Sequence, residues 1–187
     1  MPSPAELESQ IIELKQQLAE ARRANPPEPV ANYEFESADG PVKLAELFGG
    51  KDFLYVIHNM GKACQYCTLW ADTLNPIVPI LRTKAEVALC NMDSLETQRA
   101  MQASHNWDYR MVRDADRAFS QDMGYFQPAQ ESGDGRASLL PGISAFRKSS
   151  DGTVTRLNNT PFGPGDDFCP IWPLWELIGG SDWEPAG

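Results

Sequence analysis

The sequence predicts an α/β fold with a mixed central sheet flanked by helices and an N-terminal helical extension. Short apolar segments typical of buried strands alternate along the chain with segments of helical periodicity. Two further strand-like segments near the C-terminal end are joined by a turn sequence, which indicates a hairpin. With 187 residues, the chain is long enough to bury the core of one such domain and too short for two ordinary ones.

Residues 3–24 carry helix signals at both ends. Ser3, Pro4 and Glu6 form a capping box with proline at the first helical position. Apolar side chains then recur at alternating steps of four and three residues, at Leu7, Ile11, Leu14, Leu18 and Ala21. Two interpretations of this stripe are open: it packs on the body of its own chain, or it pairs with a second subunit to form a homodimer.

A proline-rich segment over residues 25–29 is predicted to be a stiff linker, which divides the chain into an N-terminal helix with its linker (1–30) and a folded domain (31–187). Strands are predicted at residues 33–37, 52–58, 86–91, 139–148 and 153–158. Helices are predicted at residues 44–48, 64–81, 93–104, 114–123 and 167–178, the second of them bent by Pro76 and Pro79. Residues 127–137 are polar and contain glycine, as in a loop.

The composition is typical of a soluble globular protein, with 42% hydrophobic and 22% charged residues. Sixteen basic and 26 acidic residues give a net charge of −10, which disfavours nucleic acid and anionic membrane surfaces as partners. The N-terminus lacks the basic start and apolar stretch of a secretory signal, so we expect a cytoplasmic protein that binds no membrane.

The chemistry of the chain is predicted to reside in a Cys-x-x-Cys pair, Cys64 and Cys67, which follows the buried strand at 52–58. A cysteine at the first turn of a helix faces unpaired backbone N–H groups and the positive end of the helix dipole, so Cys64 is expected to be a reactive thiolate. Cys67, one turn deeper, is placed to attack the resulting mixed disulfide. Two alternatives stay open: half of a zinc site, and two buried, inert thiols.

The sequence resembles the thioredoxin superfamily in two segments, residues 52–67 and residues 139–154 with Leu140-Pro141-Gly142-Ile143 at the start of the predicted hairpin. The resemblance implies a cis-proline at Pro141 that faces the dithiol, and a Leu140 backbone that binds the substrate chain. Thioredoxins also bury a carboxylate six positions before the first cysteine, which helps proton transfer to the second; this chain departs from that pattern with His58, a candidate proton relay. The alternative for His58 is a core histidine that is hydrogen-bonded to backbone.

More narrowly, the chain is similar to a bacterial thioredoxin-like family of unknown function described as predicted dithiol-disulfide oxidoreductases. The shared features are the N-terminal helix, the Cys64–Cys67 motif followed by Trp70, and Pro141-Gly142. Gln65 and Tyr66 stand between the cysteines where thioredoxins have Gly-Pro, and Tyr66 resembles the residue of glutaredoxins. Tyr66 and Trp70 are candidates for lining a substrate groove, and for Trp70 simple packing is the alternative.

These observations lead to the hypothesis of a thiol–disulfide oxidoreductase that needs no cofactor and acts on a disulfide-containing protein or a small thiol or disulfide. A thiol peroxidase is the second hypothesis, although peroxiredoxins carry threonine or serine three residues before the reactive cysteine and this chain has Gly61. A third hypothesis is a non-catalytic binding module with the same fold.

Overall fold

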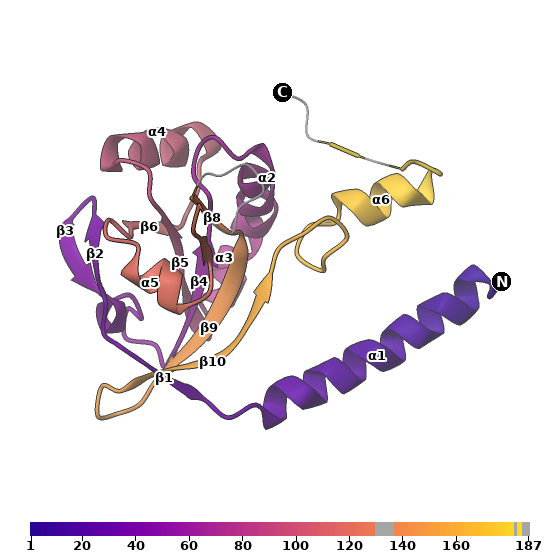
Figure 1. The fold of residues 1–187 in the computed structure, drawn as a ribbon, viewed down its shortest axis with the longest axis horizontal. Helices are drawn as coiled ribbons and strands as arrows, with labels where there is room; N and C mark the ends of the chain where they lie inside the picture. Colours follow the sequence, from indigo (N-terminus) through magenta and orange to yellow (C-terminus); the bar gives the residue numbers. More distant parts are fainter. Residues whose placement is uncertain (130–136, 182, 185–187) are drawn as a thin grey trace.

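The computed structural model describes residues 1–129, 137–181 and 183–184. Its centre is an eight-stranded sheet with the order β1-β10-β9-β4-β5-β6-β2-β3 (Figure 1). The β4–β5 and β5–β6 pairs are parallel and the other neighbouring pairs are antiparallel, so the sheet is mixed, as predicted. Its strands are Glu28–Val30 (β1), Glu34–Ser37 (β2), Gly40–Lys43 (β3), Phe53–His58 (β4), Ala85–Asn91 (β5), Arg110–Arg113 (β6), Gly142–Lys148 (β9) and Val154–Pro161 (β10).

Helices lie on both faces of this sheet (Figure 1). The predicted helix over residues 64–81 is interrupted, because Pro76 and Pro79 cannot donate the backbone hydrogen bonds of a continuous helix. The α-helices are Pro4–Ala24 (α1), Gln65–Leu74 (α2), Val78–Leu81 (α3), Leu95–His105 (α4), Ala118–Asp122 (α5) and Ile171–Leu177 (α6). Two 3-10 turns, Leu44–Glu46 (η1) and Asn75–Ile77 (η2), complete the set, and Phe126–Gln127 (β7) pairs with Ser138–Leu139 (β8) beside the main sheet.

The core has two layers because the central strands are buried on both faces. In β5, Ala88 and Cys90 point into one apolar cluster, whereas Val87 and Leu89 point into the other. The first cluster contains Phe119 of α5, and the second contains Trp70 of α2. Alternation along each strand therefore decides which layer a side chain enters.

Three strands of the main sheet were not predicted, and two of them contain proline. β1 and β3 are the two edge strands of the sheet, where a residue without a backbone N–H is tolerated. Pro29 and Pro41 therefore belong to strands, and the predicted linker over residues 25–29 overlaps the sheet from Glu28 onward. The third unpredicted strand is β6, which is four residues long and has arginine at each end.

The N-terminal helix α1 has the predicted capping box, in which the Ser3 side chain accepts from the backbone N–H of Glu6. None of its residues is buried, and the apolar stripe is exposed. The helix extends away from the sheet (Figure 1). An ion pair between Lys15 and Asp167 connects it to the segment before α6.

In two of the predicted helices, the aspartate expected at the start accepts other hydrogen bonds, and the helix begins at a later residue. Ser94, not Asp93, caps α4 by accepting from the backbone N–H of Thr97. Asp114 is buried and accepts from the backbone and side chain of Ser120, so α5 begins only at Ala118. Of the loop predicted at 127–137, residues 130–136 lie outside the described residues. None of the described helices has the length and apolar character needed to cross a membrane.

Candidate active site

The register of the central strands brings the two predicted site segments together. His58, the last residue of β4, is paired with Gly142, the first residue of β9. Pro141 therefore lies beside the loop that leads from β4 to Cys64. Gly142 is required at this crossing, since a Cβ there would lie 2.2 Å from the Tyr125 ring and 2.7 Å from the backbone oxygen of Thr160.

The loop between β4 and α2 is held by polar contacts on both sides. Asn59 is buried, accepts from the backbone N–H of Gly61 at 2.7 Å and donates to the Cys67 carbonyl at 3.4 Å. Asp93 accepts from the backbone N–H of Lys62 at 2.7 Å. Gly61 has φ +94°, and a Cβ there would lie 2.7 Å from the Asp93 carboxylate, so a larger residue would be strained and would displace Asp93.

Cys64 is the N-cap residue of α2, and the backbone N–H of Cys67 donates to its sulfur at 3.1 Å. Cys64 is half-buried, whereas Cys67 is buried one turn deeper and its sulfur accepts from the backbone N–H of Met60 at 3.5 Å. The strand–loop–helix arrangement thus places one sulfur at the surface and the other beneath it.

The two thiols have opposite electrostatic environments. The hydrogen bond with the Cys67 side chain is the largest factor that lowers the pKa of Cys64 to about 7. Backbone N–H groups of Cys67 and Tyr66 act in the same direction, and burial opposes them. The same Cys64 contact, followed by burial, raises the pKa of Cys67 far above its ordinary value. Cys64 is therefore the sulfur that carries negative charge first.

Cys64 opens onto a pocket of about 350 Å³. Of the residues proposed from the sequence, Tyr66, Trp70 and Pro141 line this pocket together with Cys64. Trp70 is 3% exposed and stacks on Phe162 with ring centroids 5.4 Å apart, so it both packs in the core and forms the floor of the pocket. The lining also includes Met60, Phe162 and Pro164.

The predicted cis-proline is wrong: the Leu140–Pro141 peptide bond is trans. Trans is the lower-energy isomer even before proline, and the loop reaches the pocket without the isomer change. Leu140 does not line the pocket around Cys64, and its backbone N–H donates to the Tyr125 carbonyl at 2.8 Å. Its predicted role in binding a substrate backbone therefore lacks a free donor.

His58 points into the layer opposite to that of Trp70. Its Nε2 is 2.9 Å from the Ser144 hydroxyl. Its ring stacks on those of Tyr125 and Phe119, with ring centroids 3.7 Å and 5.5 Å apart. Burial, followed by the charge of Arg156, lowers the pKa of His58 to about 3, so the ring is neutral near neutral pH. Among the described residues, no hydrogen bond joins His58 to either cysteine, and its role as a proton relay stays a prediction.

The other two cysteines lie in the core. Burial raises the pKa of Cys90 and of Cys169, and both thiols are buried. All four cysteines are free thiols. Within the described part of the chain, no three His, Cys, Asp or Glu side chains are grouped closely enough to hold a metal ion, so the zinc alternative lacks a complete ligand set around Cys64 and Cys67.

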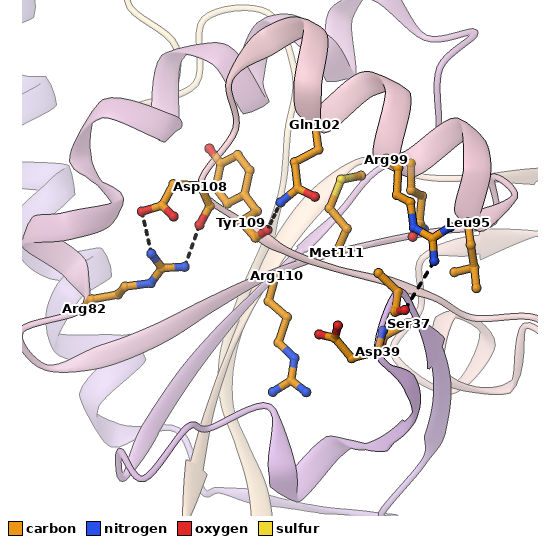
Figure 2. Close-up of a pocket in the computed structure, with 12 residues that line it drawn as sticks. Ser37, Asp39, Arg82, Leu95, Arg99, Gln102, Asp108, Tyr109, Arg110 and Met111 are labelled. Atoms are coloured by element: carbon orange, nitrogen blue, oxygen red, sulfur yellow. Dashed lines mark hydrogen bonds and ion pairs between the residues drawn. The ribbon is translucent and has the colours of Figure 1, made fainter.

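A separate polar pocket of about 270 Å³ lies between α4, β6 and the turn after β2 (Figure 2). Arg82 lies at one end of the pocket and pairs with the Asp108 carboxylate at 2.5 Å, while Arg99, at the other end, donates to the Ala38 carbonyl at 3.3 Å. Figure 2 shows Gln102 directed at Tyr109, whose carbonyl accepts from it at 2.8 Å. None of the residues proposed from the sequence lines this pocket, and its polar groups largely bind one another.

Several residues of the site were not proposed from the sequence. Asn59, Met60 and Asp93 position the thiols, and Phe162 and Pro164 complete the pocket. The position of Asn59 and Met60 between a buried strand and the Cys-x-x-Cys pair was a usable signal. Phe162 and Pro164 follow β10, about 100 residues from Cys64, and only the folded chain brings them there.

Solved structures with this fold include peroxiredoxins of low sequence identity. Peroxiredoxin Q of Xanthomonas campestris has a TM-score of 0.61 and 11% identity over 79% of this chain and 92% of its own. Reduced Prx3 of Vibrio vulnificus in complex with H2O2 has a TM-score of 0.59 and 15% identity over 74% and 88%. Peroxidoxin BcpB of Mycobacterium tuberculosis has a TM-score of 0.54 and 16% identity over 72% and 84%. The thioredoxin-like fold is therefore confirmed.

No curated protein matches the sequence. A family model described as "Bacterial protein of unknown function (DUF899)" matches residues 6–179, which include most of α1, the sheet and both cysteines of the pair. The chain therefore belongs to this family of bacterial proteins with a thioredoxin-like fold.

Proposed function

We propose that the protein is a thiol–disulfide oxidoreductase that works through Cys64 and Cys67. The observation that carries the proposal is the asymmetry of the pair: a half-buried Cys64 with a pKa of about 7 at a helix N-terminus, and a buried Cys67 with a raised pKa. A thiolate present at neutral pH and open to a pocket is the group that attacks a disulfide. The fold and its peroxiredoxin neighbours are consistent with thiol redox chemistry and do not by themselves fix the reaction.

The exchange proceeds in two steps. The Cys64 thiolate attacks one sulfur of a substrate disulfide, so that a Cys64–substrate disulfide forms and the other substrate sulfur leaves as a thiolate. Cys67 then gives up its proton and attacks the Cys64 sulfur. The Cys64–substrate bond breaks, the second substrate sulfur leaves as a thiolate and takes up a proton, and a Cys64–Cys67 disulfide remains. A cellular dithiol then reduces the Cys64–Cys67 disulfide to two thiols and is itself oxidised to a disulfide.

The test is to trap the intermediate. In Cys67→Ser the second step is blocked, so a stable mixed disulfide with a model disulfide is expected by intact-mass measurement, whereas wild type gives the internal disulfide. Cys64→Ser is expected to lose fast alkylation by iodoacetamide. Cys90→Ala and Cys169→Ala are the matched controls, since each removes a buried free thiol outside the pair. Equally slow alkylation of Cys64 and Cys67 would contradict the proposal.

A thiol peroxidase is the alternative that the same cysteines leave open. The structural neighbours favour it, because they include peroxiredoxins. The loop before Cys64 argues against a peroxidase. Gly61 stands where peroxiredoxins have threonine or serine, and the Asp93 carboxylate lies where a side chain at this position would be. Consumption of H2O2 or an organic hydroperoxide faster than reduction of a disulfide would transfer the function to the peroxidase.

A further inference from the structure

The wall of the pocket beside Cys64 is made of aromatic rings. Tyr66 lies parallel to Trp172 at 6.1 Å, and Trp70 lies 5.5 Å from Trp172. Phe162 continues this wall by stacking on Trp70. Such rings bind flat or aliphatic groups by apolar contact and by stacking.

A second hollow of about 370 Å³ adjoins the first, since Tyr66 and Pro164 line both. Its wall includes Trp172 and Trp183, which meet edge to face at 5.7 Å. We call the two hollows together the aromatic groove. It begins at Cys64 and passes Tyr66 to reach the residues after α6.

The charged side chains that line the aromatic groove are both acidic. Glu176 and Glu184 line its far end, and neither forms an ion pair within the described residues. No lysine or arginine is among the described residues that line either hollow. With a net charge of −10 on the whole chain, this end of the groove repels carboxylate-bearing ligands.

The loop facing Cys64 offers little to a peptide backbone. The Leu140 N–H is used by the Tyr125 carbonyl at 2.8 Å, and the Pro141 carbonyl accepts from the Phe162 N–H at 3.0 Å. Proline itself has no N–H to donate. An extended protein substrate therefore lacks the backbone donors that it would pair with here, which leaves recognition to the side chains of the groove.

We infer that the substrate is a small organic disulfide with aromatic or aliphatic groups next to sulfur and no negative charge, and that glutathione disulfide is disfavoured. This inference rests on the proposed exchange function. The groove would hold the organic group against Tyr66 and Trp172 while the disulfide sulfur lies at Cys64. The reaction balances as described above: one disulfide is reduced to two thiols as Cys64 and Cys67 are oxidised.

The experiment follows oxidation of the reduced, full-length protein by a series of disulfides of known charge. Dipyridyl disulfide is neutral and aromatic, dihydroxyethyl disulfide neutral, cystamine cationic, and dithiodipropionate and glutathione disulfide anionic. Each rate is divided by the rate of the same disulfide with free mercaptoethanol, which removes differences in intrinsic reactivity. Wild type is expected to favour dipyridyl disulfide over glutathione disulfide by about tenfold or more, a ratio that one well-formed aromatic contact supplies.

Two sets of variants test the two halves of the groove. Tyr66→Ala should lower the preference for dipyridyl over dihydroxyethyl disulfide about fivefold, and Tyr66→Phe should retain it. Because each ratio is taken within one variant, a change in the reactivity of Cys64 cancels. Glu176→Gln with Glu184→Gln should raise the rate with dithiodipropionate about threefold relative to dihydroxyethyl disulfide, and the effect should fade at about 0.5 M salt. Glu13→Gln with Glu20→Gln on α1 is the control with the same change of charge.

The outcomes separate the inference from the function on which it rests. If wild type reacts with none of the disulfides, the exchange function itself fails. If it reacts with all of them in proportion to their intrinsic reactivity, exchange stands and the inferred specificity is overturned. A normalised preference for glutathione disulfide, or for a protein disulfide such as insulin, also overturns it.

Discussion

At the scale of single residues, the site depends on how two identical side chains are made different. Cys64 and Cys67 share one helix start, yet only Cys64 combines solvent access with hydrogen bonds that stabilise its thiolate. The contact with Cys64, followed by burial, raises the pKa of Cys67 and so disfavours its thiolate. The position of each sulfur relative to the first turn of α2 therefore assigns its role in the proposed reaction.

The pKa of Cys64 gives a direct pH prediction. Alkylation by iodoacetamide requires the thiolate, so the rate should rise with pH, pass its midpoint near pH 7 and level off above it. A stopped-flow series between about pH 5 and pH 9 measures this profile. The profile of Cys67→Ala, which has no side-chain donor, should have its midpoint at higher pH, because the largest factor that lowers the pKa of Cys64 is its hydrogen bond with the Cys67 side chain. A wild-type midpoint at the value of an ordinary thiol would contradict the geometry.

The lowered pKa of His58 predicts that the stability of the fold depends on pH. This pKa falls from 6.5 to about 3 on folding, so below pH 6.5 the unfolded chain binds a proton that the folded chain does not. The stability contributed by neutral His58 is thus present above pH 6.5 and is lost as pH falls toward 3, at up to about 1.4 kcal/mol per pH unit. Urea unfolding of His58→Gln should show a smaller slope of stability against pH than wild type.

The same variant separates a structural histidine from a proton relay. Structural packing against Ser144 and Tyr125 predicts that His58→Gln leaves the rate of the second exchange step unchanged at neutral pH. Loss of that step with unchanged alkylation of Cys64 would instead identify His58 as a proton relay.

At the scale of elements, α1 differs from the other long helices because it has no buried residue. Among the described residues, two polar contacts join it to the rest of the chain: the exposed Lys15–Asp167 ion pair, of a kind that contributes about 0–1 kcal/mol, and a hydrogen bond from the Asn158 side chain to the Arg22 carbonyl at 3.0 Å. Deletion of residues 1–24 should therefore lower the unfolding free energy by no more than about 2 kcal/mol, measured by urea titration at low protein concentration.

A much larger loss on deletion of α1 would mean that its apolar stripe is covered in solution. The predicted homodimer through this helix remains a prediction, and the same two proteins test it. Sedimentation of the full chain and of the deletion variant over a range of concentrations should show association that depends on Leu7, Ile11, Leu14 and Leu18 if a second subunit covers the stripe.

The elements that were predicted correctly are those whose signals are local. The capping box of α1, the buried strands β4 and β5 and the hairpin of β9 and β10 each follow from neighbouring residues. The missed strands β1 and β3 contain proline, which argues against a strand except at a sheet edge. Whether a strand lies at an edge is a property of the whole sheet, so no local signal carries it.

At the scale of the whole molecule, the aromatic groove joins parts of the chain that are far apart in sequence. Cys64 and Tyr66 come from the start of α2, Pro141 from the segment before β9, Phe162 from the end of β10 and Trp172 from α6. The register of β4 against β9 sets the first of these contacts. The substrate preference inferred from the groove is thus a consequence of tertiary structure.

The amino-acid sequence by itself determined the fold class, the Cys64–Cys67 pair and the expected order of attack, because strand, loop and helix start are encoded within a few residues. Only the tertiary structure decided that Leu140–Pro141 is trans, that His58 points to Ser144 and that residues from distant segments surround Cys64. The physical reason is that hydrogen-bond partners and pocket walls depend on sheet register and strand alternation, which bring distant residues into contact.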